Sequence, residues 1–140
     1  MKDNYKNVPI VLQRIPVECA AACLVMIFAH YGKEVSLDQM SVETTVEKGY
    51  CSAGDIVRAA ERFGFTWNGY RKEPETLREF NMPCIIHWDF NHFVVLEGFK
   101  DGYVFVNDPA IGERKLTEQE FDQSYTGVVL ALQPTDRSVI

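Results

Sequence analysis

The sequence predicts an α+β fold, with a helical N-terminal half and an antiparallel sheet in the C-terminal half. Two observations lead to this prediction. Before Gly64, apolar residues recur at helical spacing and are bounded by helix-capping signals. After Gly64, the chain changes to short runs that are rich in Val, Ile and aromatic residues and are separated by turn signals. The chain of 140 residues is long enough for one domain with a sizeable core.

The longest expected helix runs from about Pro16 to Tyr31. Proline presets the backbone of a first helical turn, and Gly32 fits the left-handed position that follows a helix. Residues 20–29 are almost all apolar, which predicts a central helix that is covered on most sides. Before it, the short apolar segment 8–12 is typical of either an edge strand or an extended arm.

The remaining elements follow from capping boxes, strand-like runs and turns. A Ser or Thr followed three residues later by Gln, Asp or Glu marks the start of three short helices. The turn Lys100-Asp101-Gly102 joins two apolar runs and predicts a β-hairpin. The expected elements are helices 37–42, 53–63, 74–80 and 118–125 and strands 65–70, 84–88, 92–99, 103–107 and 128–132.

Composition and charge limit the domain organisation and the partners. We expect one domain over residues 1–133, and a polar tail or the start of a linker over 134–140. A net charge of -6 without a cluster of Lys or Arg argues against a nucleic-acid partner. No run reaches the roughly 18 apolar residues that span a membrane, and residues 1–5 lack the apolar core of a signal peptide. These features predict a cytoplasmic protein.

Four cysteines, at positions 19, 23, 51 and 84, could in principle form two disulfides. Cys19 and Cys23 lie one turn apart on the same predicted helix, and Cys84 lies in an apolar strand, so free thiols are the simpler interpretation. Cys19 and Cys23 with a histidine could alternatively hold zinc. A fourth ligand and the usual zinc-binding spacings are not apparent, so we expect no metal site.

Cys19 is the candidate nucleophile because it lies in the first turn of a largely buried helix. Unpaired N–H groups and the positive end of the helix dipole favour a thiolate there, and only the thiolate is a useful nucleophile. A cysteine inside an apolar helix is usually a small hydrophobic residue, which is our interpretation of Cys23.

The candidate base is His92. His30 lies several turns along the helix from Cys19, whereas His87 and His92 flank the short turn 88–91. His92 begins a strand whose hairpin partner leads into Asp108, and antiparallel pairing therefore places His92 near that carboxylate. Taken alone, His92 is more often structural and Asp108 before proline is a common turn residue.

Gln13, six residues before Cys19, can complete the set. Its neutral side-chain amide can donate to an oxyanion, and the backbone N–H of Cys19 would be a second donor. Taken alone, Gln13 does not indicate any function. Only the joint pattern of thiol, histidine, carboxylate and amide favours a cysteine peptidase.

These residues resemble a known family, the double-glycine leader peptidases. Its members are the papain-like N-terminal domains of bacterial peptidase-containing ABC transporters, which mature and export bacteriocins and lantibiotics. The resemblance covers residues 8–132. It rests on Gln13-x5-Cys19, Ala22-Cys23-Leu24, Tyr31-Gly32, His92-Phe93-Val94-Val95-Leu96 and Asn107-Asp108-Pro109.

The resemblance implies a papain-like fold, in which the central helix that carries the nucleophile packs on the antiparallel sheet. It also implies Cys19 as nucleophile, His92 as base, Asp108 as its orienting group and Gln13 in the oxyanion hole. Family members often carry Asp before the nucleophile, where this chain has Glu18, which keeps the charge.

The implied substrate is a precursor peptide that is cut after Gly-Gly or Gly-Ala at the end of its leader. The leader is expected to bind as an amphipathic helix in an apolar groove. Met40 and Val46 are candidates for that groove, although both also fit the ordinary core of a small helix. The implied partners are the transmembrane and nucleotide-binding domains of an ABC transporter, at the cytoplasmic face of the membrane. ATP would serve that transporter portion, and the hydrolysis itself needs no cofactor.

Two alternatives belong to other functional classes. A peptidase-like domain could dock a transported chain without cutting it, although relatives of that kind lack the nucleophile. A papain-like transferase would use the same triad, with an amine in place of water.

Overall fold

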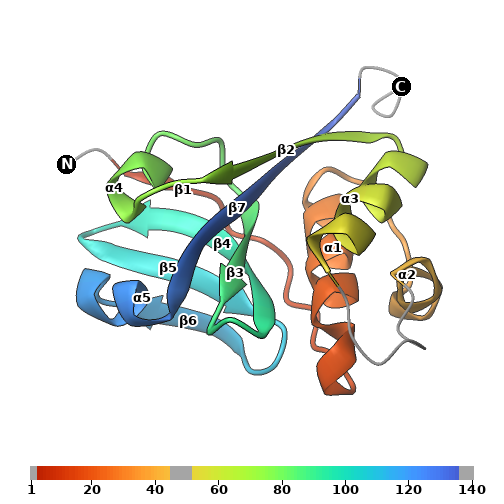
Figure 1. Ribbon diagram of the computed structural model, residues 1–140, viewed down its shortest axis with the longest axis horizontal. Helices are drawn as coiled ribbons and strands as arrows, with labels where there is room; N and C mark the ends of the chain where they lie inside the picture. The colour runs from red at the N-terminus through yellow and green to blue at the C-terminus, as the bar shows by residue number, and fades with distance from the viewer. Residues whose placement is uncertain (1–2, 45–51, 136–140) are drawn as a thin grey trace.

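The computed structural model describes residues 3–44 and 52–135 and shows three helices beside an antiparallel sheet (Figure 1). The helices α1 (Cys19–His30), α2 (Leu37–Glu43) and α3 (Ala53–Arg62) gather on one side, and a 3-10 turn, η1 (Pro16–Glu18), leads into α1. The short helices α4 (Pro74–Leu77) and α5 (Glu118–Ser124) lie with the sheet. The predicted α+β class is confirmed.

The seven-stranded sheet has the order β2-β7-β3-β4-β5-β6, with β1 paired to β4, and every pair is antiparallel. A Cβ atom on Gly98, whose φ is +134°, would lie 1.9 Å from the carbonyl oxygen of Asn4 in β1. Glycine is therefore required where β1 crosses β4. The strands are β1 (Asn4–Tyr5), β2 (Phe65–Arg71), β3 (Cys84–Trp88), β4 (His92–Lys100), β5 (Tyr103–Asp108), β6 (Gly112–Leu116) and β7 (Tyr125–Pro134).

The core has two parts, one on each face of the sheet. On one face, α1 packs against Phe93 and Val95 of β4, and ten consecutive residues of α1 are buried. On the other face, Val94 and Leu96 pack with Phe121 of α5. Successive residues of a strand point to opposite faces, so β4 contributes to both parts. The prediction of a covered central helix is confirmed.

Two strands, β1 and β6, could not be predicted from an alternation of apolar and polar residues. In β6 only Gly112 and Leu116 are buried, and the three residues between them are Glu, Arg and Lys. Charged side chains suit a strand at the edge of a sheet, where they discourage pairing with other chains. Segment 8–12 is an extended arm rather than a strand, and it is anchored by the buried Val8.

The helix expected over 74–80 is shorter than predicted. The α-helix ends at Leu77, and the side-chain amide of Asn4 donates to the carbonyl oxygens of Arg78 at 2.9 Å and Phe80 at 2.7 Å. These contacts satisfy carbonyls just after the helix that have no partner within it. Sequence spacing alone does not show a partner that lies more than 70 residues away.

Candidate active site

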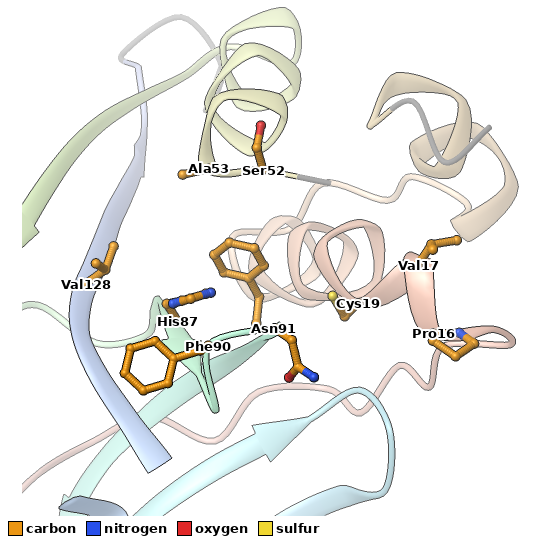
Figure 2. Close-up of a pocket in the computed structure, with 10 residues that line it drawn as sticks. Pro16, Val17, Cys19, Ser52, Ala53, His87, Phe90, Asn91 and Val128 are labelled. Atoms are coloured by element: carbon orange, nitrogen blue, oxygen red, sulfur yellow. The ribbon is translucent and has the colours of Figure 1, made fainter. Parts of the chain in front are cut away.

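Cys19 is the first residue of α1, directly after η1, and its sulfur faces a cleft (Figure 2). The cleft has a volume of about 500 Å³. Cys19 itself is only 4% exposed. Ser52 and Ala53 at the start of α3 form one side of the cleft, and His87 and Val128 of the sheet form another. A cysteine in the first turn of a buried helix, open to solvent only through a cleft, is a suitable position for a nucleophile.

His92 and Asp108 form a direct pair at the adjoining end of the sheet. The Nε2 atom of His92 lies 2.7 Å from Oδ1 of Asp108. The same carboxylate oxygen accepts the backbone N–H of Ala110 at 2.9 Å, and Arg114 lies 3.9 Å from Oδ2. Burial acts to raise the pKa of Asp108, but these partners, His92 first, hold it below its ordinary value. The prediction that the β4–β5 hairpin brings His92 to Asp108 is confirmed.

Two hydrogen bonds and a shared cleft bring the start of α1 close to this pair. The backbone N–H of Gln13 donates to the carbonyl oxygen of Pro109 at 2.8 Å, directly after Asp108. The thiol of Cys23, one turn after Cys19, donates to the carbonyl oxygen of Phe93 at 3.4 Å. Phe93 in turn lines the cleft together with Cys19. His92 lies between Asn91 and Phe93, both of which line the cleft.

Gln13 is half-buried in the loop before η1. Its amide oxygen is buried and accepts no hydrogen bond from any residue in the described part of the chain. The backbone bond to Pro109 fixes the loop, so the position of Gln13 is set while its amide oxygen stays uncommitted. A polar group in this state is unusual in a protein interior, where nearly all such groups have partners.

Glu18, which the sequence analysis treated only as a departure from the family, organises this loop. Its buried carboxylate accepts the backbone N–H of Arg14 at 2.8 Å, the Arg14 guanidinium at 2.5 Å and the Ser41 hydroxyl at 2.9 Å. Hydrogen bonding by Arg14, against the opposing effect of burial, lowers the pKa of Glu18 to about 2. No helical signal in the sequence marks this pair, because Arg14 lies in the loop before η1 and not on a helix.

His87 is the second residue that sequence reasoning did not place in the site. Its Nδ1 atom lies 2.9 Å from the hydroxyl of Thr126, and its ring packs against Phe93 with centroids 5.1 Å apart. The alternation of β3 could have found it, because Ile85 faces α1 and His87, two residues on, shares that face.

The expectation of a leader groove at Met40 is corrected. Met40 has no exposed surface and belongs to the core beside α1, which is the alternative that the sequence left open. The other groove candidate, Val46, lies outside the described residues. Within those residues, no group of three His, Cys, Asp or Glu side chains could hold a metal ion.

The other chemical features of the chain are consistent with a single reactive thiol in the described segments. Burial raises the pKa of the Cys84 thiol to about 12, which makes it inert near neutral pH. No helix within residues 3–44 and 52–135 has the length and apolar character needed to cross a membrane.

Comparison with known proteins shows which family the chain belongs to. The chain is 35% identical over 129 residues to the colicin V secretion/processing ATP-binding protein CvaB of Escherichia coli. It is 29% identical over 131 residues to the lactococcin-G-processing and transport ATP-binding protein LagD of Lactococcus lactis subsp. lactis. These matches cover 92% and 89% of this chain, but only 18% and 19% of the relatives. The chain therefore spans about a fifth of the length of these curated relatives.

A solved structure of another protein aligns with nearly the whole chain. A double glycine motif protease from an AMS/PCAT transporter, crystallised in complex with the leader peptide, is 44% identical to this chain and superposes with a TM-score of 0.90. The match covers 96% of this chain and 100% of that one. The peptidase C39 family model matches residues 7–137. The chain therefore belongs to the peptidase C39 family and is a cysteine peptidase domain.

Proposed function

We propose that this domain cleaves leader peptides from ribosomally made precursors, directly after a Gly-Gly or Gly-Ala pair. The observation that carries this proposal is the 2.7 Å pair of His92 and Asp108, held next to the cleft that exposes Cys19. A thiol, a base and an orienting carboxylate are what a papain-like peptidase requires. The similarity to a double glycine motif protease supports the choice of substrate.

In the proposed reaction, His92 and Cys19 form an ion pair, and the thiolate attacks the carbonyl carbon of the last leader residue. The amide of Gln13 and the backbone N–H of Cys19 stabilise the oxyanion. His92 then protonates the leaving amine, which frees the mature peptide and leaves a thioester. Water attacks this acyl-enzyme as His92 takes its proton, and the leader leaves with a new carboxylate. Asp108 stabilises the protonated imidazole throughout.

The leader would bind in an apolar groove between α3 and the sheet. This groove has a volume of about 390 Å³ and includes Trp67 and Tyr70, each 39% exposed. Ala53 and Val128 line both the groove and the Cys19 cleft, so the two adjoin. An amphipathic helix could lay its apolar face over Trp67 and direct its C-terminal end towards Cys19. This proposal replaces Met40 as the groove candidate.

We further propose that the domain works with the transmembrane and nucleotide-binding parts of an ABC transporter, at the cytoplasmic face of a membrane. The relatives that carry such a domain are named as secretion or transport ATP-binding proteins. Hydrolysis by Cys19 and His92 needs no cofactor, so ATP would be used only by the transporter parts.

The test is incubation of the domain with a synthetic peptide that carries an amphipathic leader, Gly-Gly and a short C-terminal extension. Intact mass spectrometry should show one cut after the second glycine, and a Cys19→Ala variant should give none. A peptide with Val at both glycine positions is the matched control and should stay intact. Tight binding without a cut by the unmodified domain would instead favour the docking alternative.

A further inference from the structure

His87 has a fixed ring and one ring nitrogen without a hydrogen-bond partner among the described residues. The Thr126 hydroxyl donates to the carbonyl oxygen of His87 at 3.4 Å and lies 2.9 Å from Nδ1, so we assign the tautomer in which Nδ1–H donates to that hydroxyl oxygen. In that tautomer Nε2 is an acceptor. No residue in the described ranges forms a hydrogen bond to Nε2, although the side chain lines the cleft.

The ring is also held by its neighbours. It packs at an angle on Phe93, with centroids 5.1 Å apart, and meets the edge of Phe90 at 6.3 Å. Burial, and to a smaller extent the charge of His92, lower the pKa of His87. A rigid neutral imidazole with an open acceptor is suited to binding a ligand N–H group.

His87 lies on the path between the apolar groove and the nucleophile. In Figure 2, His87 stands between Val128, which the groove and the cleft share, and Cys19. A leader that passes from the groove to Cys19 therefore has its last residues beside this ring. Glycine has no side chain, so a site can recognise a Gly-Gly segment only through its backbone groups and by excluding larger residues.

We propose that His87 is a substrate-binding residue, whose Nε2 atom accepts a hydrogen bond from a backbone N–H of the Gly-Gly segment. This inference rests on the proposed function and names the group that holds the scissile segment on the leader side of Cys19. The role differs from that of His92, because His87 transfers no proton and contributes only to binding.

Two substitutions separate this role from a structural one. Asparagine places its polar atom near the position of Nδ1 and keeps the bond to Thr126, but it loses the acceptor in the cleft. Glutamine reaches the position of Nε2 with an acceptor oxygen. In a Cys19→Ala background, we would measure the Kd of the Gly-Gly leader peptide by isothermal titration calorimetry for His87, His87→Asn and His87→Gln. A leader truncated before the two glycines serves as the control ligand.

We expect His87→Asn to weaken binding of the Gly-Gly peptide about tenfold, and His87→Gln to stay within about threefold of the parent. The truncated leader should bind all three proteins equally. Four results would overturn the inference. The first two are weaker binding in His87→Gln but not in His87→Asn, and an equal loss of affinity for both peptides. The others are an unchanged Kd in every variant, and no measurable binding of the Gly-Gly peptide to the parent. Cleavage by the protein with Cys19 intact tests the proposed function separately, because these affinities are measured without any cut.

Discussion

The two histidines at the β3–β4 turn have different partners. His87 is the fourth residue of β3 and His92 begins β4, and Trp88 pairs with His92 across the turn. His92 is bonded to the carboxylate of Asp108, whereas His87 is bonded to the hydroxyl of Thr126. A carboxylate stabilises a protonated imidazole, and a hydroxyl does not. A histidine can therefore serve as a base at one end of the turn, and a second histidine can serve as a neutral binding group at the other.

The turn between the two histidines is strained at two residues. Asp89 and Phe90 both have positive φ, at 52° and 63°, although neither is glycine. Phe90 is also 81% exposed and lines the cleft. Conformations of this kind cost of order 1 kcal/mol or more and cluster at functional sites. The strained turn thus lies between two histidines that differ in their hydrogen-bond partners.

The largest effect should follow from removing the charge opposite His92. Asp108→Asn keeps the size of the side chain and an acceptor oxygen but removes the negative charge that stabilises a protonated imidazole, so kcat/KM should fall about 1,000-fold. Progress curves with the Gly-Gly peptide would measure this, with thermal unfolding as a control for folding. If activity fell less than about tenfold, Asp108 would have no special role at His92.

Glu18→Ala should disturb the nucleophile side of the site without touching either histidine. Loss of its bonds frees the loop that carries Gln13, so kcat should fall about tenfold with little change in KM. The pKa of Glu18 is lowered to about 2, so its contribution to stability is present above about pH 4.5 and is lost as the pH falls towards 2.

Urea unfolding at pH 7 should show a loss of about 2 kcal/mol in Glu18→Ala, and a smaller loss at pH 3. The Glu18 carboxylate is buried, but its partner Arg14 is half-exposed, and solvent there reduces the loss of stability. Equal losses at both pH values would contradict the assignment of a charged Glu18.

Thr126→Val tests the other histidine. Without its hydroxyl partner, the His87 ring loses its fixed orientation, so KM should rise about threefold while kcat stays unchanged. Steady-state kinetics separates the two constants. A fall in kcat with constant KM would mean that His87 takes part in the chemistry and that the contrast with His92 is wrong.

Glu97→Gln neutralises a buried carboxyl group on β4 and should not affect either histidine. Burial, together with the nearby Glu113, raises the pKa of Glu97 to about 8. The folded state therefore keeps a proton that the unfolded state releases near pH 4.5, and this stabilisation is lost as the pH rises through 8. Among the described residues, Glu97 and Asn107 each carry a buried side-chain oxygen without a hydrogen-bond partner, and protonation lets the Glu97 carboxyl group act as a donor.

The unfolding free energy should thus fall between pH 5 and pH 9 in the parent, by at most about 5 kcal/mol at 1.36 kcal/mol per pKa unit. The fall should be clearly smaller in Glu97→Gln, whose amide oxygen can still accept the N–H of Val8, and kcat/KM should not change. Identical pH profiles of stability in the two proteins would show that Glu97 does not titrate in this range.

Much of the fold and of the site could be predicted from the sequence, because their determinants are local. The capping residues at Ser36, Ser52 and Thr117 begin helices as expected. The hairpin register was sufficient to bring His92 to Asp108.

The remaining features depend on contacts between distant segments. Thr126 meets His87 only because β7 pairs with β3. The apolar groove is lined by residues of α3, β2 and β7, which lie apart in the sequence. The sequence alone could not show this groove, and Met40 was the wrong candidate for it. The charged residues of β6 obscure its alternation, and β1 is fixed by its passage over Gly98.

The central claim is that His92, and not His87, activates Cys19. The most direct measurement is the rate of Cys19 alkylation by iodoacetamide between pH 5 and 9, with peptide mass spectrometry to identify the modified cysteine. We compare the unmodified domain with His92→Ala and His87→Ala. The account predicts rapid alkylation at pH 6 in the unmodified domain and in His87→Ala, and its loss in His92→Ala. Retained reactivity in His92→Ala with loss in His87→Ala would contradict the account.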